Sequence, residues 1–318
     1  MNLNNIEYKQ YDQCYLEQII ELWNTTLIYD PINKQRFIDL ILLDDNFNKE
    51  LVLLALDKDK DMVVGFILGI KRQVPYLNRG LEPTRGWISL MFIKKEYQRK
   101  GIATKLVNLI EYAFIAKGTK EITLCAYSPN YFFPGIDKRY EAANIFFNKL
   151  NYIKHSEAVS MQRDLWDYSL PTNTINKINT LKEEGISFIK YNDNYMNALL
   201  NFVKEEFDAG WIRNVLISMQ KHIAKDTILL CINSDNKVLG YCMRKIDNND
   251  SRFGPIGVSK QLRSKGIGGI LLDLMLLDMK SSNINYMYFL WTHGDAQRFY
   301  LNHGVKVYRT YNLYRKEI

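Results

Sequence analysis

Residues 93–103 read IKKEYQRKGIA, and residues 258–268 read VSKQLRSKGIG. Each stretch begins at a β-branched residue and has Gln or Arg five positions later, Gly three positions after that, and a small residue two positions further on. The glycines, Gly101 and Gly266, are 266 − 101 = 165 residues apart, about half of the 318-residue chain. A motif that recurs at this spacing predicts a duplicated domain.

The elements around the two motifs repeat in the same order. Before each motif, two short apolar runs joined by a polar turn are typical of a β-hairpin, and after it apolar residues recur at helical spacing. The strands expected in the first half are 51–55, 63–70, 87–93, 121–127 and 154–165, and those in the second half are 228–232, 238–243, 256–258, 286–291 and 306–314. The helices expected are 16–27, 102–113 and 141–150, and then 195–207, 267–274 and 296–303.

The boundary between the halves is expected in residues 169–184. This segment is polar, contains Pro171 and lacks the alternation of a strand, so it is interpreted as a linker. The predicted domains are therefore 1–168 and 185–318.

In each half, a strand ends in a glycine-containing loop that opens a helix. The first N–H groups of a helix have no partner within the helix, and the helix dipole favours negative charge there. Glycine allows the backbone to approach a diphosphate closely. Arg99, Lys100, Arg263 and Lys265 add positive charge beside the two loops. Both loops are therefore predicted to bind an anion.

These loops resemble the signature of the GNAT superfamily of N-acyltransferases, which is Gln or Arg, two residues, Gly, one residue, and then Gly or Ala. The signature is complete at Gln98–Ala103 and again at Arg263–Gly268, and the resemblance covers both halves nearly end to end. It implies an α/β (α+β) fold of two tandem GNAT-like domains, each a mixed, mostly antiparallel twisted sheet flanked by helices.

The resemblance also implies acetyl-CoA (coenzyme A) as the cofactor. In the family, backbone amides of the loop hold the pyrophosphate, and the end of the preceding strand lies along the pantetheine arm. The residues expected to bind it are Met91, Phe92, Ile93, Gln98, Arg99, Lys100, Gly101, Ile102, Ala103 and Thr104 in the first domain, and Ile256, Gly257, Val258, Arg263, Ser264, Lys265, Gly266, Ile267, Gly268 and Gly269 in the second.

Direct transfer from a thioester to an amine requires loss of a proton from the amine and a proton for the leaving thiolate. Members of the family often use a tyrosine on the helix after the fifth strand as the acid, and Tyr300 matches that place. The first domain has Phe147 there, which has no proton to donate, and Asn151 in place of the family's glycine. This favours the second domain as the catalytic one. The first domain either uses Tyr127, Ser128 or a water as acid, or is a structural or regulatory copy. The general base is not identified by the sequence.

The leading functional hypothesis is an acyltransferase that moves an acetyl or other short acyl group from acyl-CoA to a primary amine of a small molecule or peptide. The alternative is a CoA-binding sensor or scaffold in which one or both domains are non-catalytic. The net charge of +7 suits an anionic cofactor, but the basic residues are dispersed, which argues against nucleic-acid binding. No His or Cys spacing indicates a metal site. The sequence has no apolar run long enough for a membrane span and no signal-peptide pattern from Met1 to Asn5, so a cytoplasmic monomer or homodimer is expected.

Overall fold

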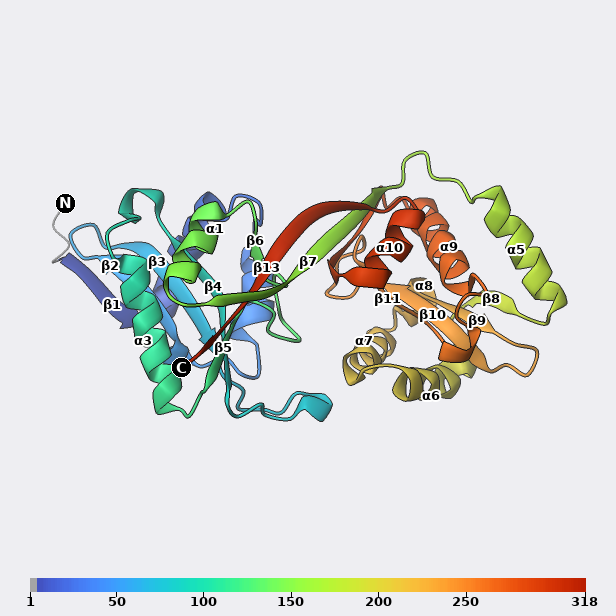
Figure 1. Ribbon diagram of the computed structural model, residues 1–318, viewed down its shortest axis with the longest axis horizontal. Coiled ribbons are helices and arrows are strands. Elements are labelled where there is room, and N and C mark those ends of the chain that lie inside the picture. Colours follow the sequence, from blue (N-terminus) through green and yellow to red (C-terminus); the bar gives the residue numbers. More distant parts are fainter. Residues whose placement is uncertain (1–4) are drawn as a thin grey trace. The chain divides into compact units, whose positions relative to one another are not determined.

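The computed structural model describes residues 5–318, so most of the N-terminal stretch considered above lies outside the described residues. The chain forms two compact units (Figure 1). The first comprises the chain to Ala158 together with Thr310–Ile318, and the second comprises Val159–Arg309. Among the helices of residues 5–318, none is long and apolar enough to cross a membrane.

The first unit is a twisted sheet with helices on both faces. Its strands are β1 (Ile6–Gln10), β2 (Val52–Asp57), β3 (Met62–Ile70), β4 (Arg85–Ile93), β5 (Glu121–Leu124), β6 (Ile136–Asp137) and the first part of β7 (Ile153–Asp164). Its helices are α1 (Leu16–Thr26), α2 (Lys34–Phe37), α3 (Ile102–Ala116) and α4 (Glu141–Lys149). β1 to β4 pair with their neighbours antiparallel, whereas β4 and β5 are parallel.

Two apolar clusters hold the helices of the first unit to its sheet. One contains Trp23 of α1 and Phe66 and Phe92 of the sheet, and the other contains Leu106 and Phe114 of α3. β3 is buried over almost its whole length, and the run MVVGFILGI is apolar throughout because both of its faces are covered.

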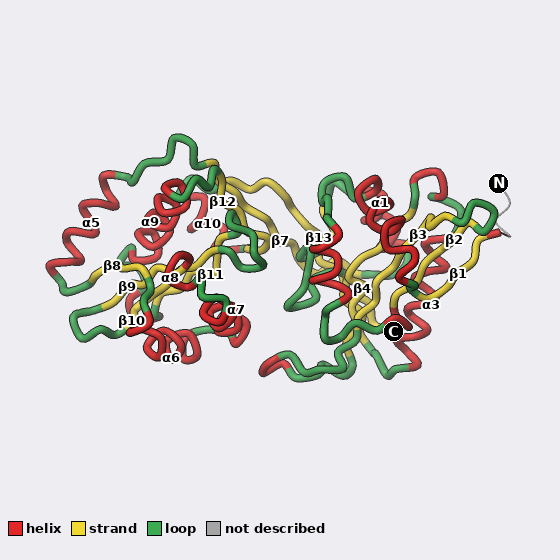
Figure 2. Tube along the Cα trace, turned by 180° about the vertical axis from the view of Figure 1, so that it is seen from behind, coloured by secondary structure: helices red, strands yellow, loops and turns green. Residues whose placement is uncertain are grey.

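The second unit repeats this plan. Its strands are β8 (Ser187–Lys190), β9 (Ile228–Ile232), β10 (Val238–Arg244), β11 (Phe253–Val258) and β12 (Tyr286–Thr292), and the first four form an antiparallel sheet in the order β11-β10-β9-β8. β12 pairs with the part of β7 that belongs to this unit, from Tyr286↔Asp164 to Thr292↔Val159. Its helices are α5 (Thr172–Glu183), α6 (Met196–Glu206), α7 (Ala209–Gln220), α8 (Ala224–Thr227), α9 (Ile267–Ser281) and α10 (Gly294–Asn302). The prediction of mixed, mostly antiparallel sheets flanked by helices is confirmed (Figure 2).

The last strand, β13 (Lys306–Glu317), completes the first unit, whereas the sequence analysis placed it in the second. Its residues from Thr310 onward belong to the first unit, where Arg315 pairs with Thr123 of β5 and Tyr311 pairs with Asp137 of β6. In Figure 1 the end of the red β13 lies beside the green β5. Conversely, Val159–Asp164 of β7 lie in the second unit. The units therefore do not coincide with the expected domains 1–168 and 185–318.

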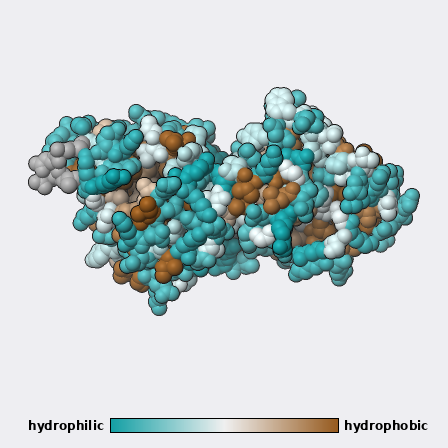
Figure 3. Space-filling view, turned by 45° about the horizontal axis from the view of Figure 1, so that its top comes forward, coloured by the Kyte–Doolittle hydropathy of each residue, from teal (hydrophilic) through white to brown (hydrophobic). Residues whose placement is uncertain are grey.

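The segment 169–184 is also more regular than expected. It forms α5 after Pro171, and Thr174, Ile178 and Leu181 of this helix face the core of the second unit. These three residues follow helical spacing, so the segment is a packed helix rather than an extended linker. Elsewhere, hydrophobic residues on the face shown in Figure 3 lie in separate small groups on a mostly hydrophilic surface.

Candidate functional site

In the first unit, β4 and β5 pair over only part of their length. The parallel register runs from Arg85↔Glu121 to Ile88↔Leu124, and the N–H of Cys125 donates the next bond to Ile88 O at 2.9 Å. Cys125 and Ala126 then take left-handed φ values of 57° and 56°, which end the strand earlier than the predicted residue 127. The register of β4 against β3 also shifts here, so that Ser89 lies in a bulge. β4 thus continues to Ile93 after β5 has turned away, and no described strand pairs with this edge of β4 beyond Ile88.

The second unit has the same separation of strands. β11 and β12 meet at the bridge between Arg252 and Tyr288, where the N–H of Tyr288 donates to Ser251 O at 3.0 Å. From there β11 follows β10 and β12 follows β7, so the two strands diverge.

The loop after β4 forms an open cradle. Gly101 is the N-cap residue of α3 with φ +80°, and Arg99 is also left-handed with φ 58°. The side chain of Gln98 closes the loop by donating from Nε2 to Ile93 O at 3.0 Å, and Lys100 Nζ donates to Glu96 O at 2.6 Å. Among the described residues, no atom would lie within 4 Å of a β-carbon added at Gly101. The space beside Gly101 is therefore open at the start of α3, the end of the helix where the first N–H groups have no partner within the helix.

The corresponding loop of the second unit is partly covered. Gly266 is the N-cap of α9 with φ +81°, but Lys177 of α5 lies over it, with Nζ 3.6 Å from the position of an added β-carbon. Lys265 Nζ pairs with Glu184 Oε2 at 2.9 Å, which ties the loop to the end of α5. Lys177 thus adds a cation at this cradle that is not part of the sequence motif.

The strand ends beside the two loops also differ. In the first unit, half-buried Met91 packs toward α3, whereas buried Phe92 faces the opposite cluster. In the second, the ring of Phe207 lies directly on Gly257, since its Cζ is 2.3 Å from where a β-carbon would be. Phe207 stacks on Trp211 with ring centroids 4.5 Å apart and an interplanar angle of 11°. This face of β11 is therefore covered by aromatic rings.

The remaining predicted binding residues lie around the same two helix starts. Ile102 and Ile267 are buried and anchor α3 and α9 to their sheets, while Gly269 is covered by the ring of His303. Ile93 is also buried. The others lie beside the loops and are half-buried or exposed, and they are Ala103, Thr104, Ile256, Val258, Arg263, Ser264 and Gly268.

Tyr300 lies on α10, in the apolar core of the second unit. Its ring centroid is 4.4 Å from that of Phe289 and 6.3 Å from that of Phe253, which places it beside β12 and β11. Burial raises the pKa of Tyr300 above its ordinary value, with a smaller contribution from Cys242. In the first unit Phe147 occupies the matching place on α4, buried against Tyr152. Tyr127 is fully buried and its hydroxyl contacts Asp44 and Asn46, away from the loop after β4.

Sequence reasoning missed a polar pair in the first unit. The loop after α1 brings Asp30 to the start of α4, where Tyr140 Oη donates to Asp30 Oδ2 at 3.0 Å. Burial, and to a smaller extent the charge of Asp30, raises the pKa of the Cys125 thiol to about 12. Trp23 Nε1 donates to Asp30 O at 2.6 Å and its ring centroid is 5.7 Å from that of Phe92, so the pair lies beside the part of β4 that continues past β5. The 110 residues between Asp30 and Tyr140 explain why no local pattern revealed it.

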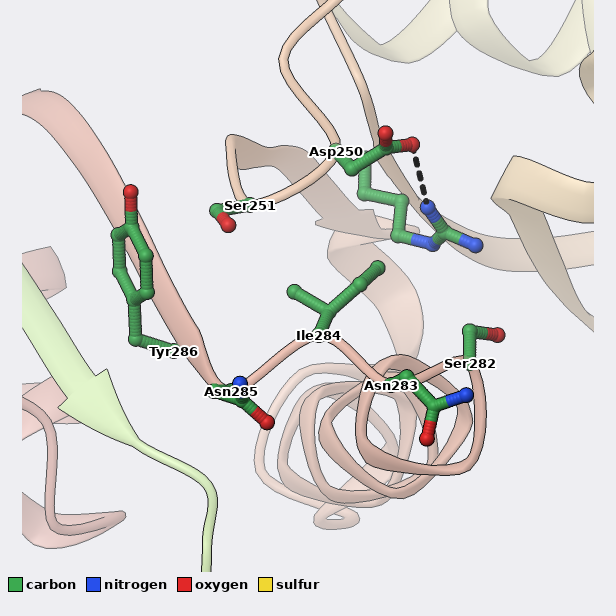
Figure 4. Close-up of a pocket in the computed structure, with 8 residues that line it drawn as sticks. Asp250, Ser251, Ser282, Asn283, Ile284, Asn285 and Tyr286 are labelled. Atoms are coloured by element: carbon green, nitrogen blue, oxygen red, sulfur yellow. Dashed lines mark hydrogen bonds and ion pairs between the residues drawn. The ribbon is translucent and has the colours of Figure 1, made fainter.

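A polar pocket of 460 Å³ lies elsewhere in the second unit, at the C-terminal end of α9 (Figure 4). It is lined by Arg244, Asp250, Ser251, Ser282, Asn283, Ile284, Asn285 and Tyr286. None of these belongs to the predicted loops, and the Gly266 loop lies at the other end of α9. Within residues 5–318, no group of three His, Cys, Asp or Glu side chains could hold a metal ion.

Comparisons with known proteins agree with this geometry. The model of the acetyltransferase (GNAT) family matches residues 12–132 and 196–305, more than half of the chain. No curated protein sequence matches significantly. Among solved structures, the glucosamine N-acetyltransferase region of a fungal multi-domain β-N-acetylglucosaminidase is similar with a TM-score of 0.78 and 20% identity over 98% of this chain, which spans 38% of that protein.

Two further structures are similar over nearly their whole lengths. An N-acetyltransferase from Sphaerobacter thermophilus has a TM-score of 0.73 and 14% identity, with 100% of this chain and 97% of that chain covered. A tandem GNAT protein of the clavulanic acid pathway has a TM-score of 0.64 and 13% identity, with 98% of each chain covered. At these identities the structures show the shared fold, while the family model identifies the family. The chain therefore belongs to the GNAT family of acetyltransferases, and it carries the family's domain twice.

Proposed function

We propose that the protein is an N-acetyltransferase that moves an acetyl or other short acyl group from acyl-CoA to a primary amine by direct transfer. The observation that supports this best is the open cradle at Gly101, which lies directly after the strand whose edge β5 leaves free. Gln98 through Thr104 would hold the pyrophosphate, and Met91 to Ile93 would line the pantetheine arm. Acyl-CoA, when bound, would supply an activated thioester carbon for the amine to attack.

The proposal is tested by binding and turnover together. Titration of the protein with acetyl-CoA in a calorimeter should give heat and the number of sites per chain. Thiol release is then followed with glucosamine, spermidine, an aminoglycoside and a peptide with a free N-terminal amine. Glucosamine is included because the fungal protein of similar structure is described as acting on it. Absence of heat with acetyl-CoA would contradict acyl-CoA dependence, and binding without thiol release from any amine would favour a sensor or scaffold.

For the second unit, we propose Tyr300 as the group that protonates the leaving thiolate. A tyrosine is protonated at neutral pH and can therefore donate a proton, and burial raises the pKa of Tyr300 further, which makes this phenol a weaker acid than an exposed one. Tyr300→Phe should lower the turnover of this unit by about 10²- to 10⁴-fold. The measurement uses a Gly101→Asp background, which disables the first cradle, so that all remaining thiol release comes from the second. The assignment would be contradicted if the double variant released thiol as fast as Gly101→Asp alone, or if Gly101→Asp alone released no thiol.

Lys177 is expected to strengthen binding at the second cradle. Its ammonium lies 3.6 Å from the β-carbon position of Gly266, at the start of α9, where a diphosphate would be held. Loss of a charge-assisted contact costs about 1.5–3 kcal/mol, so Lys177→Ala should raise the Kd for acetyl-CoA by about ten-fold or more, and most strongly at low salt. Lys182→Ala on the same helix is the matched control, because Lys182 is likewise exposed but is not among the residues next to Gly266. Calorimetry in the Gly101→Asp background measures both, and equal effects of the two changes would contradict a specific role.

A further inference from the structure

The loop after α1 is held against the start of α4 by several contacts. Tyr140 Oη donates to Asp30 Oδ2 at 3.0 Å and accepts from the N–H of Tyr29 at 3.3 Å, while the two tyrosine rings lie 5.4 Å apart. Arg139 lies over the ring of Tyr29 at 3.9 Å and forms a two-pronged ion pair with Asp137. On the other side, Trp23 Nε1 donates to Asp30 O at 2.6 Å. Tyr140, the residue before α4, therefore holds the Asp30 carboxylate, and Trp23 of α1 holds the Asp30 backbone carbonyl.

This residue lies beside β4, where β5 has turned away. Cys125 is the first residue beyond β5, and its N–H makes the last bond to β4. Trp23, which donates to Asp30 O, has its ring centroid 5.7 Å from that of Phe92 in β4. Met91 of β4, Cys125 and Tyr140 pack against the same apolar cluster beneath α3 and α4. Asp30 therefore lies beside the part of β4 that continues past the end of β5.

Asp30 is also within reach of solvent. Its side chain is only half-buried, and its neighbours Ile28 and Tyr29 are 65% and 43% exposed. Asp44, a second carboxylate on this face of the sheet, is different. It is 8% exposed, and its oxygens accept hydrogen bonds from Tyr127, Asn130 and the N–H of Asn46. Asp44 has a structural role, whereas Asp30 can meet an acceptor that arrives from outside.

We propose that Asp30 is the proton acceptor for the amine in the first unit and that Tyr140 positions its carboxylate, an inference that rests on the proposed function. The pKa is about 10 for an alkyl amine and about 8 for a peptide N-terminus, so at pH 7 the amine reaches the site mainly as an ammonium ion, and a carboxylate attracts that form. The ammonium gives one proton to Asp30, and its nitrogen bonds to the thioester carbon. The carbon–sulfur bond breaks, the sulfur leaves with the electron pair, and the second proton of the nitrogen passes to that sulfur. Asp30 then returns its proton to solvent. The first unit needs no tyrosine at Phe147 for this sequence.

The test uses Asp30→Asn and Tyr140→Phe in a Gly266→Asp background, which disables the second cradle. The assay is thiol release from acetyl-CoA with the amine of the panel that the unmodified protein accepts best. Asp30→Asn should lower kcat/KM at pH 7 by about 10²- to 10³-fold, with the KM for acetyl-CoA unchanged. Tyr140→Phe should lower it by about ten-fold, because the carboxylate loses its partner while the ring packing is kept. Asp39→Asn, the same chemical change at an exposed position nearby, should leave the rate unchanged.

The pH profile separates catalysis from a merely structural contact. With Asp30→Asn, activity should recover toward the unmodified level as the pH approaches about 10, because the amine then arrives already deprotonated. A loss of equal size at every pH, together with a lower melting temperature, would overturn the inference and make the pair a structural latch. Full activity of Asp30→Asn at pH 7, or an inactive Gly266→Asp background in a protein that is otherwise active, would overturn it too. No thiol release by the unmodified protein with any amine would instead reject the proposed function itself.

Discussion

Gly101→Asp is expected to raise the Kd for acetyl-CoA at the first cradle by at least about 100-fold, or about 2.7 kcal/mol. The added carboxylate would project from the N-cap of α3 into space that is open in the structure. There it would accept hydrogen bonds from the same N–H groups that a diphosphate needs, and it would repel the diphosphate. Calorimetry should show the loss of one acetyl-CoA site per chain.

Two matched variants separate this effect from backbone strain. Gly101→Asn has nearly the same shape without the charge, and both residues tolerate a left-handed backbone such as the φ of +80° at this position. It should weaken binding far less than the aspartate. Gly118, at the other end of α3, has φ +76°, and no described residue would lie within 4 Å of a β-carbon added there. Gly118→Asp should bind acetyl-CoA normally. If all three variants bind alike, the loop after β4 is not the diphosphate site.

The two cradles could be predicted because each depends on a few neighbouring residues. A glycine before an apolar helical stripe is enough to indicate a helix start with free N–H groups, and both Gly101 and Gly266 are N-cap residues with left-handed φ. The hairpins before them follow from apolar runs separated by polar turns, and β2–β3 and β9–β10 confirm them. In these elements local physics and the final fold agree.

The interpretation of 169–184 as a linker did not foresee α5. The segment is polar because only one stripe of the helix is buried, with Thr174 and Leu181 among the buried residues. Ile175 remains 44% exposed. A short amphipathic stripe that contains a threonine is a weak signal in sequence. The packing of this stripe nevertheless fixes the position of α5, and with it the position of Lys177 over the second cradle. The difference between the two cradles therefore could not be predicted from their similar motifs.

The residues proposed to act on the amine acceptor could not be predicted from the sequence either. Asp30 belongs to a loop, and Tyr140 precedes a helix, so neither belongs to a periodic pattern. Their contact depends on how α1 and α4 pack on the two faces of one sheet, and packing of that kind is set by tertiary structure. The absence of a tyrosine at Phe147 favoured the second unit, and the alternatives in the first unit, Tyr127, Ser128 or a water, did not include Asp30 or Tyr140.

The strand at 306–314 was predicted, but not the sheet that it joins. A strand's alternation shows that it pairs, whereas the choice of partner depends on chain segments that are distant in sequence. Tyr311, Leu313 and Tyr314 are 0%, 7% and 2% exposed, and all three lie in the part of β13 that belongs to the first unit. The first unit therefore contains chain from both ends of the sequence.

Deletion of residues 310–318 is accordingly expected to unfold the first unit and to spare the second. Burial of the three side chains contributes about 2 kcal/mol each, and the pairing with β5 and β6 is lost with them. A total of about 6 kcal/mol is comparable with the whole stability of a domain, about 5–15 kcal/mol. Hydrogen exchange should show loss of protection in α3 and β5, with protection kept in β9 and β10. Arg315→Ala is the control, because its ion pair with Glu121 is partly exposed and such pairs contribute little.

Addition of the missing segment as a separate peptide tests the cause of that instability. A peptide of residues 306–318 can restore the backbone pairing beside β5 by adding a strand to an open edge. Tyr314 Oη would again donate to Asn144 Oδ1 of α4, a contact of 3.1 Å in the intact chain. Protection in α3 and β5 should then return as the peptide concentration rises, whereas a peptide with Tyr311 and Tyr314 both replaced by Asp should have no effect. Unchanged protection of the first unit after the deletion would show that β13 is dispensable there. Recovery with both peptides would show that backbone pairing alone, without burial of these two rings, holds the unit together.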